Sequence, residues 1–192
     1  AATDINGSAT AVETLLIKAD GNTAAITGAG AIDAIDAITI VDSATAGTDV
    51  TIDVNGYGTA LTIDATALDA GTTAASADNE VLTISNISGK ALNVKGGGGP
   101  DVIQDSASND TIEGNGGSDV ITADQGGVDT IKGGDGNDTI NMGATLTAAD
   151  TIDGGDGTDT VNVTSLTAAA LAGITNVETL GYTAAGALSL AA

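Results

Sequence analysis

Short runs of β-branched and aliphatic residues alternate with turn-forming residues along the first half of the chain. The predicted strands are "TLLIKA" at 14–19, "AITIV" at 37–41, "VTIDV" at 50–54, "LTID" at 61–64 and "VLTI" at 81–84. The runs recur roughly every 10 to 12 residues, which is the spacing of an all-β sandwich, barrel or solenoid. Residues 1–95 are therefore predicted to form a β-rich region, either a β-solenoid or a β-sandwich.

From residue 96 the pattern becomes a short repeat rich in Gly, Asp and Asn. Its units are "GGGGPDVIQ", "DSASNDTIE", "GNGGSDVIT", "ADQGGVDTIK", "GGDGNDTIN", "MGATLTAADTID" and "GGDGTDTVN". In every unit an Asp stands two places before an Ile or Val. These aspartates are Asp101, Asp110, Asp119, Asp129, Asp138, Asp150 and Asp159. Their steps of 9, 9, 10, 9, 12 and 9 residues define a repeat domain over residues 96–162.

The unit can be written G-G-x-G-x-D-x-U-x, where U is a large apolar residue. Glycine adopts the backbone angles of tight turns at little cost, so the first six positions are predicted to form a turn. The last three are predicted to be extended, with the apolar residue pointing inward. Two units make one coil of a parallel β-roll, and turns two units apart stack about 4.8 Å from each other.

Composition supports a thin, stacked interior. The chain has 192 residues and contains no Phe, Trp, His or Cys. Large aromatic side chains usually fill the centre of a compact core, whereas small branched ones suit a repeated, quasi-one-dimensional fold. The predicted fold class is all-β, a parallel β-roll or β-solenoid that follows the β-rich N-terminal half.

The charge limits the partners. The net charge is −22, from 26 acids against 4 basic residues. No basic patch can form to bind nucleic acid, and an anionic membrane surface is equally unsuitable. No apolar run is long enough to span a bilayer, so membrane insertion is not expected. Acids at this density oppose compaction unless cations neutralise them, which makes cations the first partner to consider.

The repeated turns offer oxygen ligands. Each turn exposes carbonyls that glycine leaves unshielded and ends in a carboxylate, so two stacked turns can supply the oxygen ligands that calcium prefers. Magnesium fits less well, and soft metals find no Cys or His. The candidate ligands are the seven aspartates together with turn glycines of the four best-formed units. These glycines are Gly97, Gly99, Gly114, Gly117, Gly134, Gly136, Gly155 and Gly157.

Odd and even units differ. The first, third, fifth and seventh units share one side of the roll and approach the full glycine pattern, with Asp101, Asp119, Asp138 and Asp159. The second, fourth and sixth units lie on the other side, where "DSASND", "ADQGGVD" and "MGATLTAAD" replace the motif. We expect about three sandwiched calcium ions on the first side, and fewer or irregular ones on the second.

The nonapeptide resembles the calcium-binding repeats of the repeats-in-toxin (RTX) family. The resemblance covers residues 96–162 and is close in "GGGGPDVIQ", "GGDGNDTIN" and "GGDGTDTVN". It implies a calcium-loaded parallel β-roll in a protein that leaves a bacterial cell unfolded through a type I system. The Ala-, Thr- and Asp-rich flanks and "LAGITNVETL" look, more loosely, like bacterial surface-layer (S-layer) proteins.

The last segment, 163–192, is rich in Ala and Leu and is predicted to be a cap, an assembly element or a secretion signal. "SLTAAALAGI" predicts a short helix capped by the Ser165 hydroxyl. "NVETLGYT" predicts a strand. The tetrapeptide Val-Glu-Thr-Leu occurs at 12–15 and again at 177–180, which suggests either a shared strand entry or related docking elements at the two ends.

The composition bears on three classes of function. An enzyme is not expected, because without His, Cys or Arg the usual nucleophile–base pairs are missing. An adhesin or ligand-binding module, for example for a cell-surface polysaccharide, usually needs exposed aromatic residues, and only Tyr57 and Tyr182 are present. The favoured class is a calcium-dependent structural protein that assembles with copies of itself into a surface layer or matrix filament; the alternative is a calcium-stabilised adhesin that does not assemble.

Location follows from the calcium requirement. Extracellular calcium modules bind at roughly 10⁻⁴ to 10⁻³ M, far above cytosolic calcium. The repeats would therefore stay unfolded in the cytosol and fold outside, because the free energy of binding is also free energy of folding. We expect an extracellular protein, secreted or on the bacterial surface. The resemblance to type I-exported RTX proteins implies an uncleaved export signal after the repeats, where the acid-poor tail ending "GALSLAA" lies. On that expectation Ala1 follows a removed Met.

Overall fold

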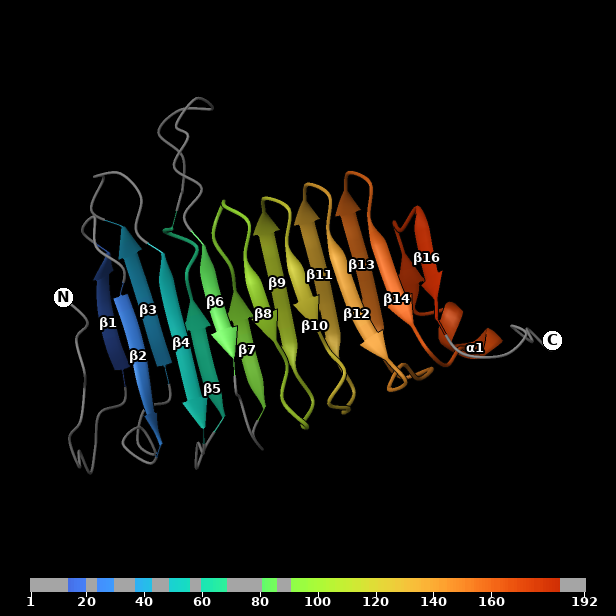
Figure 1. Ribbon diagram of the computed structural model, residues 1–192, viewed down its shortest axis with the longest axis horizontal. Helices are drawn as coiled ribbons and strands as arrows, with labels where there is room; N and C mark the ends of the chain where they lie inside the picture. Colours follow the sequence, from blue (N-terminus) through green and yellow to red (C-terminus); the bar gives the residue numbers. More distant parts are fainter. Residues whose placement is uncertain are drawn as a thin grey trace.

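A computed structural model describes residues 14–19, 24–29, 37–42, 49–55, 60–68, 81–85 and 91–183. The strands of these segments form two parallel sheets of eight strands each, stacked along the long axis of the molecule (Figure 1). One sheet contains the odd-numbered strands and the other the even-numbered strands. The chain thus alternates between the sheets at every strand, which is the topology of a β-solenoid.

The odd-numbered sheet runs from the N-terminal to the C-terminal end without interruption. Its strands are β1 (Thr14–Ala19), β3 (Ala37–Asp42), β5 (Leu61–Asp64), β7 (Leu92–Lys95), β9 (Thr111–Gly116), β11 (Thr130–Asp135), β13 (Thr151–Asp156) and β15 (Ile174–Thr175). The even-numbered sheet is its counterpart. It contains β2 (Ala24–Ala29), β4 (Val50–Asn55), β6 (Leu82–Ser85), β8 (Val102–Gln104), β10 (Val120–Thr122), β12 (Thr139–Gly143), β14 (Thr160–Val163) and β16 (Thr179–Tyr182).

The N-terminal half is a solenoid, one of the two folds that its sequence allowed. All five strands predicted there are present, and β2 and β7 are additional. The composition changes near residue 95, but strand pairing continues across it, since β7 pairs with β5 on one side and with β9 on the other. The repeats therefore extend a stack that has already begun.

The core is a narrow double column of aliphatic side chains. In the repeat region each strand contributes an apolar residue in register with the same residue of the next coil, as Ile112, Ile131 and Ile152 show in the odd-numbered sheet. All three are fully buried. Side chains of this size fill the space between the sheets, which explains how the fold does without Phe and Trp.

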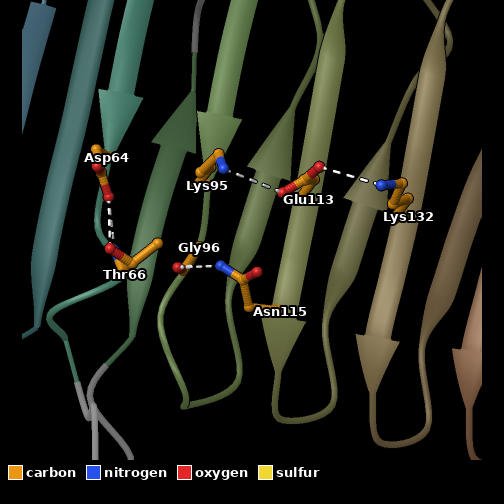
Figure 2. Close-up of polar contacts among 7 residues, drawn as sticks. All are labelled: Asp64, Thr66, Lys95, Gly96, Glu113, Asn115 and Lys132. Atoms are coloured by element: carbon orange, nitrogen blue, oxygen red, sulfur yellow. Dashed lines mark hydrogen bonds and ion pairs between the residues drawn. The ribbon is translucent and has the colours of Figure 1, made fainter.

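The outer face of the odd-numbered sheet carries a column of charges. Asp64, Lys95, Glu113, Lys132 and Asp153 stand in register on successive strands. Glu113 lies between the two lysines, with contacts of 3.6 Å from Lys95 Nζ and 3.3 Å from Lys132 Nζ (Figure 2). Alternating charges avoid the repulsion that identical residues in register would cause.

The C-terminal segment contains the predicted helix, but with a different cap. The helix α1 is short, Ala168–Leu171, and its N-cap is Thr167, whose hydroxyl accepts a hydrogen bond from the Ala170 amide. The prediction of Ser165 as the cap is therefore wrong. The Thr167 hydroxyl reaches the amide three residues ahead, as an N-cap side chain does, whereas Ser165 lies two residues before the N-cap. Within the described residues no helix is long and apolar enough to cross a membrane.

Candidate calcium sites along the glycine edge

Two kinds of turn connect the sheets in the repeat region. The turns from odd to even strands contain the well-formed units, and we call this side the glycine edge: residues 96–101, 117–119, 136–138 and 157–159. The turns from even to odd strands, at 105–110, 123–129 and 144–150, form the opposite edge. The structure thus separates the odd and even units as their spacing predicted.

The seven aspartates of the repeats are all buried. Asp101, Asp119, Asp138 and Asp159 lie on the glycine edge, and Asp110, Asp129 and Asp150 on the opposite edge, each with 3% or less of its surface exposed. A buried carboxylate is costly unless it is hydrogen-bonded, paired with a charge or bound to a metal. What each carboxylate contacts therefore decides its role.

On the glycine edge one oxygen of each carboxylate ties two coils together. Asp119 Oδ1 accepts a hydrogen bond of 2.7 Å from the Asp101 amide of the preceding coil. The same bond joins Asp138 Oδ1 to the Asp119 amide and Asp159 Oδ1 to the Asp138 amide, both at 2.8 Å. The aspartates form a continuous hydrogen-bonded row, in which every carboxylate serves the coil before it.

The second oxygen of three of these carboxylates has no hydrogen-bond partner in the described chain. These atoms are Oδ2 of Asp119, Asp138 and Asp159, and all are buried. Each is turned toward the Cα of the glycine at the first position of its own unit. A methyl group built on Gly133, for example, would overlap both Asp138 Oδ2 and the Gly154 carbonyl oxygen of the following coil. The absence of a side chain at this glycine lets the two oxygens converge.

The donor atoms fit calcium. A charged carboxylate oxygen and a backbone carbonyl oxygen from consecutive coils are hard ligands of the type that calcium takes. Among the described residues, no group of three or more acidic side chains converges on one point. A cation at this edge would therefore be held by one carboxylate oxygen per coil, by carbonyls and by water.

The backbone conformation of the glycines repeats from coil to coil in the three units that carry an unpartnered oxygen. Gly134 and Gly136 have φ values of 120° and 128°, which other residues rarely adopt, and Gly155 and Gly157 repeat the pair one coil later at 103° and 141°. In the third unit Gly117 is left-handed at 113°, with Asn115 in the place of the other glycine.

The sequence overstated the length of these turns. Gly114, Gly134 and Gly155 lie inside β9, β11 and β13, so the first three positions of these units extend the odd-numbered sheet instead of belonging to the turn. The reason is that glycine in register with glycine lets the backbones of neighbouring coils pair closely.

The first unit differs from the other three. Asp101 Oδ2 accepts a hydrogen bond of 2.8 Å from the Gly97 amide, so this carboxylate is already satisfied. Gly97 and Gly99 do not adopt the left-handed conformation of the later units. Four units match the motif, but only three carry the open oxygen.

On the opposite edge, hydroxyl groups hydrogen-bond two of the three repeat carboxylates, those of Asp110 and Asp150. Ser106 Oγ lies 2.9 and 3.0 Å from the two Asp110 oxygens, and the Ser106 amide donates to the same side chain. Thr147 donates both its amide and its hydroxyl to Asp150 Oδ2. Asp129 Oδ1 accepts from the Asp110 amide. For Asp110 and Asp150 the chain itself supplies hydrogen bonds in the place of a cation.

Burial shifts the acidity of the row. It raises the pKa of Asp119 to about 7, although the hydrogen bond from the Asp101 amide acts in the opposite direction. The charges of Asp101 and Asp138 also raise this pKa. Burial likewise raises the pKa of Asp101 to about 6. On the opposite edge the pKa of Asp129 rises to about 6 for the same reason. Carboxylates that are this reluctant to ionise gain from a nearby cation.

Sequence reasoning missed Asp105. It is fully buried on the opposite edge, where Oδ2 accepts a hydrogen bond of 3.1 Å from the Gln125 amide and Oδ1 has no hydrogen-bond partner among the described residues. Burial raises its pKa to about 7. Written in register, Asp105 stands at the first glycine position of its unit, and that substitution was the available signal. Asn176 and Glu178, which lie beyond the repeats, were missed as well.

These features define a class of protein: a parallel β-roll whose glycine turns present buried oxygen ligands. A protein-family model, the RTX calcium-binding nonapeptide repeat (4 copies), matches residues 95–127, 125–144 and 145–164. Residues 95–164 are thus RTX calcium-binding repeats, as their resemblance implied, and such repeats bind calcium and are typical of secreted bacterial proteins. Searches of curated proteins and of solved structures find no significant match.

Proposed function

We propose that this protein is a structural component of a bacterial cell surface or extracellular matrix, which folds on calcium after type I export and assembles with copies of itself. In this proposal the chain catalyses no reaction. The calcium requirement rests on Asp119, Asp138 and Asp159, whose unpartnered oxygens oppose folding until a cation neutralises them.

One observation at the C-terminal end supports assembly. Leu180 in β16 is in register with Val161, a fully buried core residue, yet 38% of its surface is exposed. Its position belongs to the core column, but in the described chain no further strand follows β16 in its sheet. A coil from another copy would cover this residue and pair with the edge strand.

The two ends of the stack have related sequences. Val-Glu-Thr-Leu leads into β1 at 12–15 and into β16 at 177–180, although residues 12 and 13 lie outside the described segments. A contact between unlike ends repeats without closing, and such contacts generate filaments or, with lateral contacts, layers.

Electron microscopy of the purified protein tests the proposal. We expect filaments or sheets at millimolar calcium that disappear with a chelator. Leu180→Lys should abolish them, because it places a charge in the open core column. Val102→Lys is the matched control, since Val102 is similarly exposed at 44% but points outward from the face of the even-numbered sheet. A calcium-loaded wild-type protein that stays monomeric at high concentration would contradict assembly and favour the adhesin alternative, which glycan binding would then test.

A further inference from the structure

The unpartnered aspartate oxygens depend on carbonyl groups of the next coil, so the last of them depends on a coil beyond the repeats. Each unpartnered carboxylate oxygen faces a carbonyl of the following coil, so the row needs one coil beyond each aspartate. For Asp119 and Asp138 that carbonyl belongs to Gly133 and Gly154, both inside the repeats. For Asp159 it is the carbonyl of Asn176, which lies after the last residue matched as a repeat.

Asn176 reproduces the turn of a repeat without its glycines. Its φ of 50° is left-handed, a conformation that Asn tolerates better than most residues. Its side-chain amide donates a hydrogen bond of 2.7 Å to Asp153 Oδ1 of the preceding coil. With this backbone conformation the Asn176 carbonyl lies against Gly154, where a methyl group would overlap both this oxygen and Asp159 Oδ2.

Glu178 takes the place of the next aspartate. Its Oε2 accepts a hydrogen bond of 2.8 Å from the Asp159 amide, the bond that an aspartate Oδ1 accepts elsewhere in the row. The connection is shorter here: Ile174 to Glu178 spans four residue steps, whereas Ile152 to Asp159 spans seven. The extra methylene of Glu gives the reach that the shortened turn lacks.

We infer that Asp159 Oδ2 and the Asn176 carbonyl form a calcium site closed by the segment after the repeats, with Glu178 as a positioning residue. Asp159 is fully buried, and its Oδ2 has no partner in the described chain, so the site has a charged ligand in place. The inference rests on calcium binding by the repeats and does not depend on assembly. The last ion then joins the repeats to their C-terminal cap.

Calcium bound per chain, measured by equilibrium dialysis of the full protein with elemental analysis, tests the carbonyl. Asn176→Val should lose one ion relative to wild type, because a β-branched residue resists positive φ and turns the carbonyl away. Asn176→Gly is the matched control and should keep the wild-type number. Adding Asp138→Asn to either variant should remove one further ion, which would show that the repeats of that variant still bind calcium.

A second pair of variants tests Glu178 without touching the left-handed residue. Glu178→Ala should weaken the last ion about tenfold or more, as the loss of an outer-shell partner does in other metal sites, whereas Glu178→Gln keeps an acceptor and should bind nearly as wild type. The inference is overturned if folded Asn176→Val retains the wild-type number of ions, or if Asn176→Gly loses an ion as well. It is also overturned if Glu178→Ala binds its last ion as tightly as Glu178→Gln. A loss of filaments with an unchanged ion count would count against assembly alone.

Discussion

Gly133 is the residue at which the oxygen row can be tested most sharply by a single methyl group. In Gly133→Ala the new Cβ would overlap Asp138 Oδ2 and the Gly154 carbonyl oxygen. The second of these belongs to the backbone and cannot rotate away, so the coil has to shift. Gly116→Ala is the control on the same edge, because its Cβ would meet nothing closer than Gly98 Cα at 3.6 Å.

The expected effects have opposite signs. Overpacking a tight site costs about 1–3 kcal/mol, so Gly133→Ala should lower the free energy of unfolding by at least that amount. Replacing Gly116 removes conformational freedom from the unfolded chain and should raise the free energy of unfolding by about 0.4–1 kcal/mol. Gly133→Ala should also bind one calcium ion fewer, since its methyl group fills the space where the two ligand oxygens converge.

Urea unfolding followed by circular dichroism at a fixed millimolar calcium concentration measures the first quantity, and equilibrium dialysis measures the second. Equal unfolding midpoints for the two variants would refute the steric argument. An unchanged ion count in Gly133→Ala would refute the placement of calcium between Asp138 and the following coil.

Three further outcomes follow from the site and its surroundings. Asp138→Asn should lose a calcium ion whereas Asp150→Asn should not, because hydrogen bonds already occupy Asp150; equal losses in dialysis would show that both edges bind calcium alike. Without calcium, folding should become less favourable as pH rises from 3.8 toward about 7, because folded Asp119, with its raised pKa, holds a proton that the unfolded chain releases; circular dichroism that shows β-structure increasing across this range would contradict it. Glu113→Gln should cost about 1 kcal/mol or less in urea unfolding, since Lys95 and Lys132 are half-exposed, and a much larger loss would show that the charged column is not a surface feature.

The repeat was predictable because its period appears directly in the sequence. Asp138 and Ile140 stand at the same offset as Asp119 and Ile121, and a constant offset in a stacked fold means a constant place in space. That reasoning was enough to place the aspartates inside the turns, the isoleucines in the core and the well-formed units on one edge.

Strand propensity did not predict strands that exist because they pair with a neighbouring strand. The strand β2, "AAITGA", contains three Ala and one Gly, which are poor strand formers, yet its backbone pairs with β4 over six residues. Such a strand exists because the stack offers it a neighbouring edge. Local sequence has no information about that edge.

The sequence also did not reveal which carboxylates the chain satisfies with its own hydrogen bonds. Gly97 matches the motif, but its amide donates to Asp101 and satisfies that carboxylate. Ser106 and Asn176 depart from the motif, yet one satisfies a carboxylate and the other supplies a carbonyl to the row. Motif matching alone therefore ranks the first unit too high and overlooks the segment after the last.

The aspartate row has a direction. The amide of Asp101 donates to Asp119, that of Asp119 to Asp138, that of Asp138 to Asp159 and that of Asp159 to Glu178, so each of these four amides depends on a residue that comes later in the chain. A chain that emerged from a pore C-terminus first could close these coils one by one as they appeared, starting from Glu178. A chain that emerged N-terminus first would leave each newest coil waiting for the next. If the chain is exported through a pore, the direction of the aspartate row therefore makes folding during export depend on which terminus leaves first.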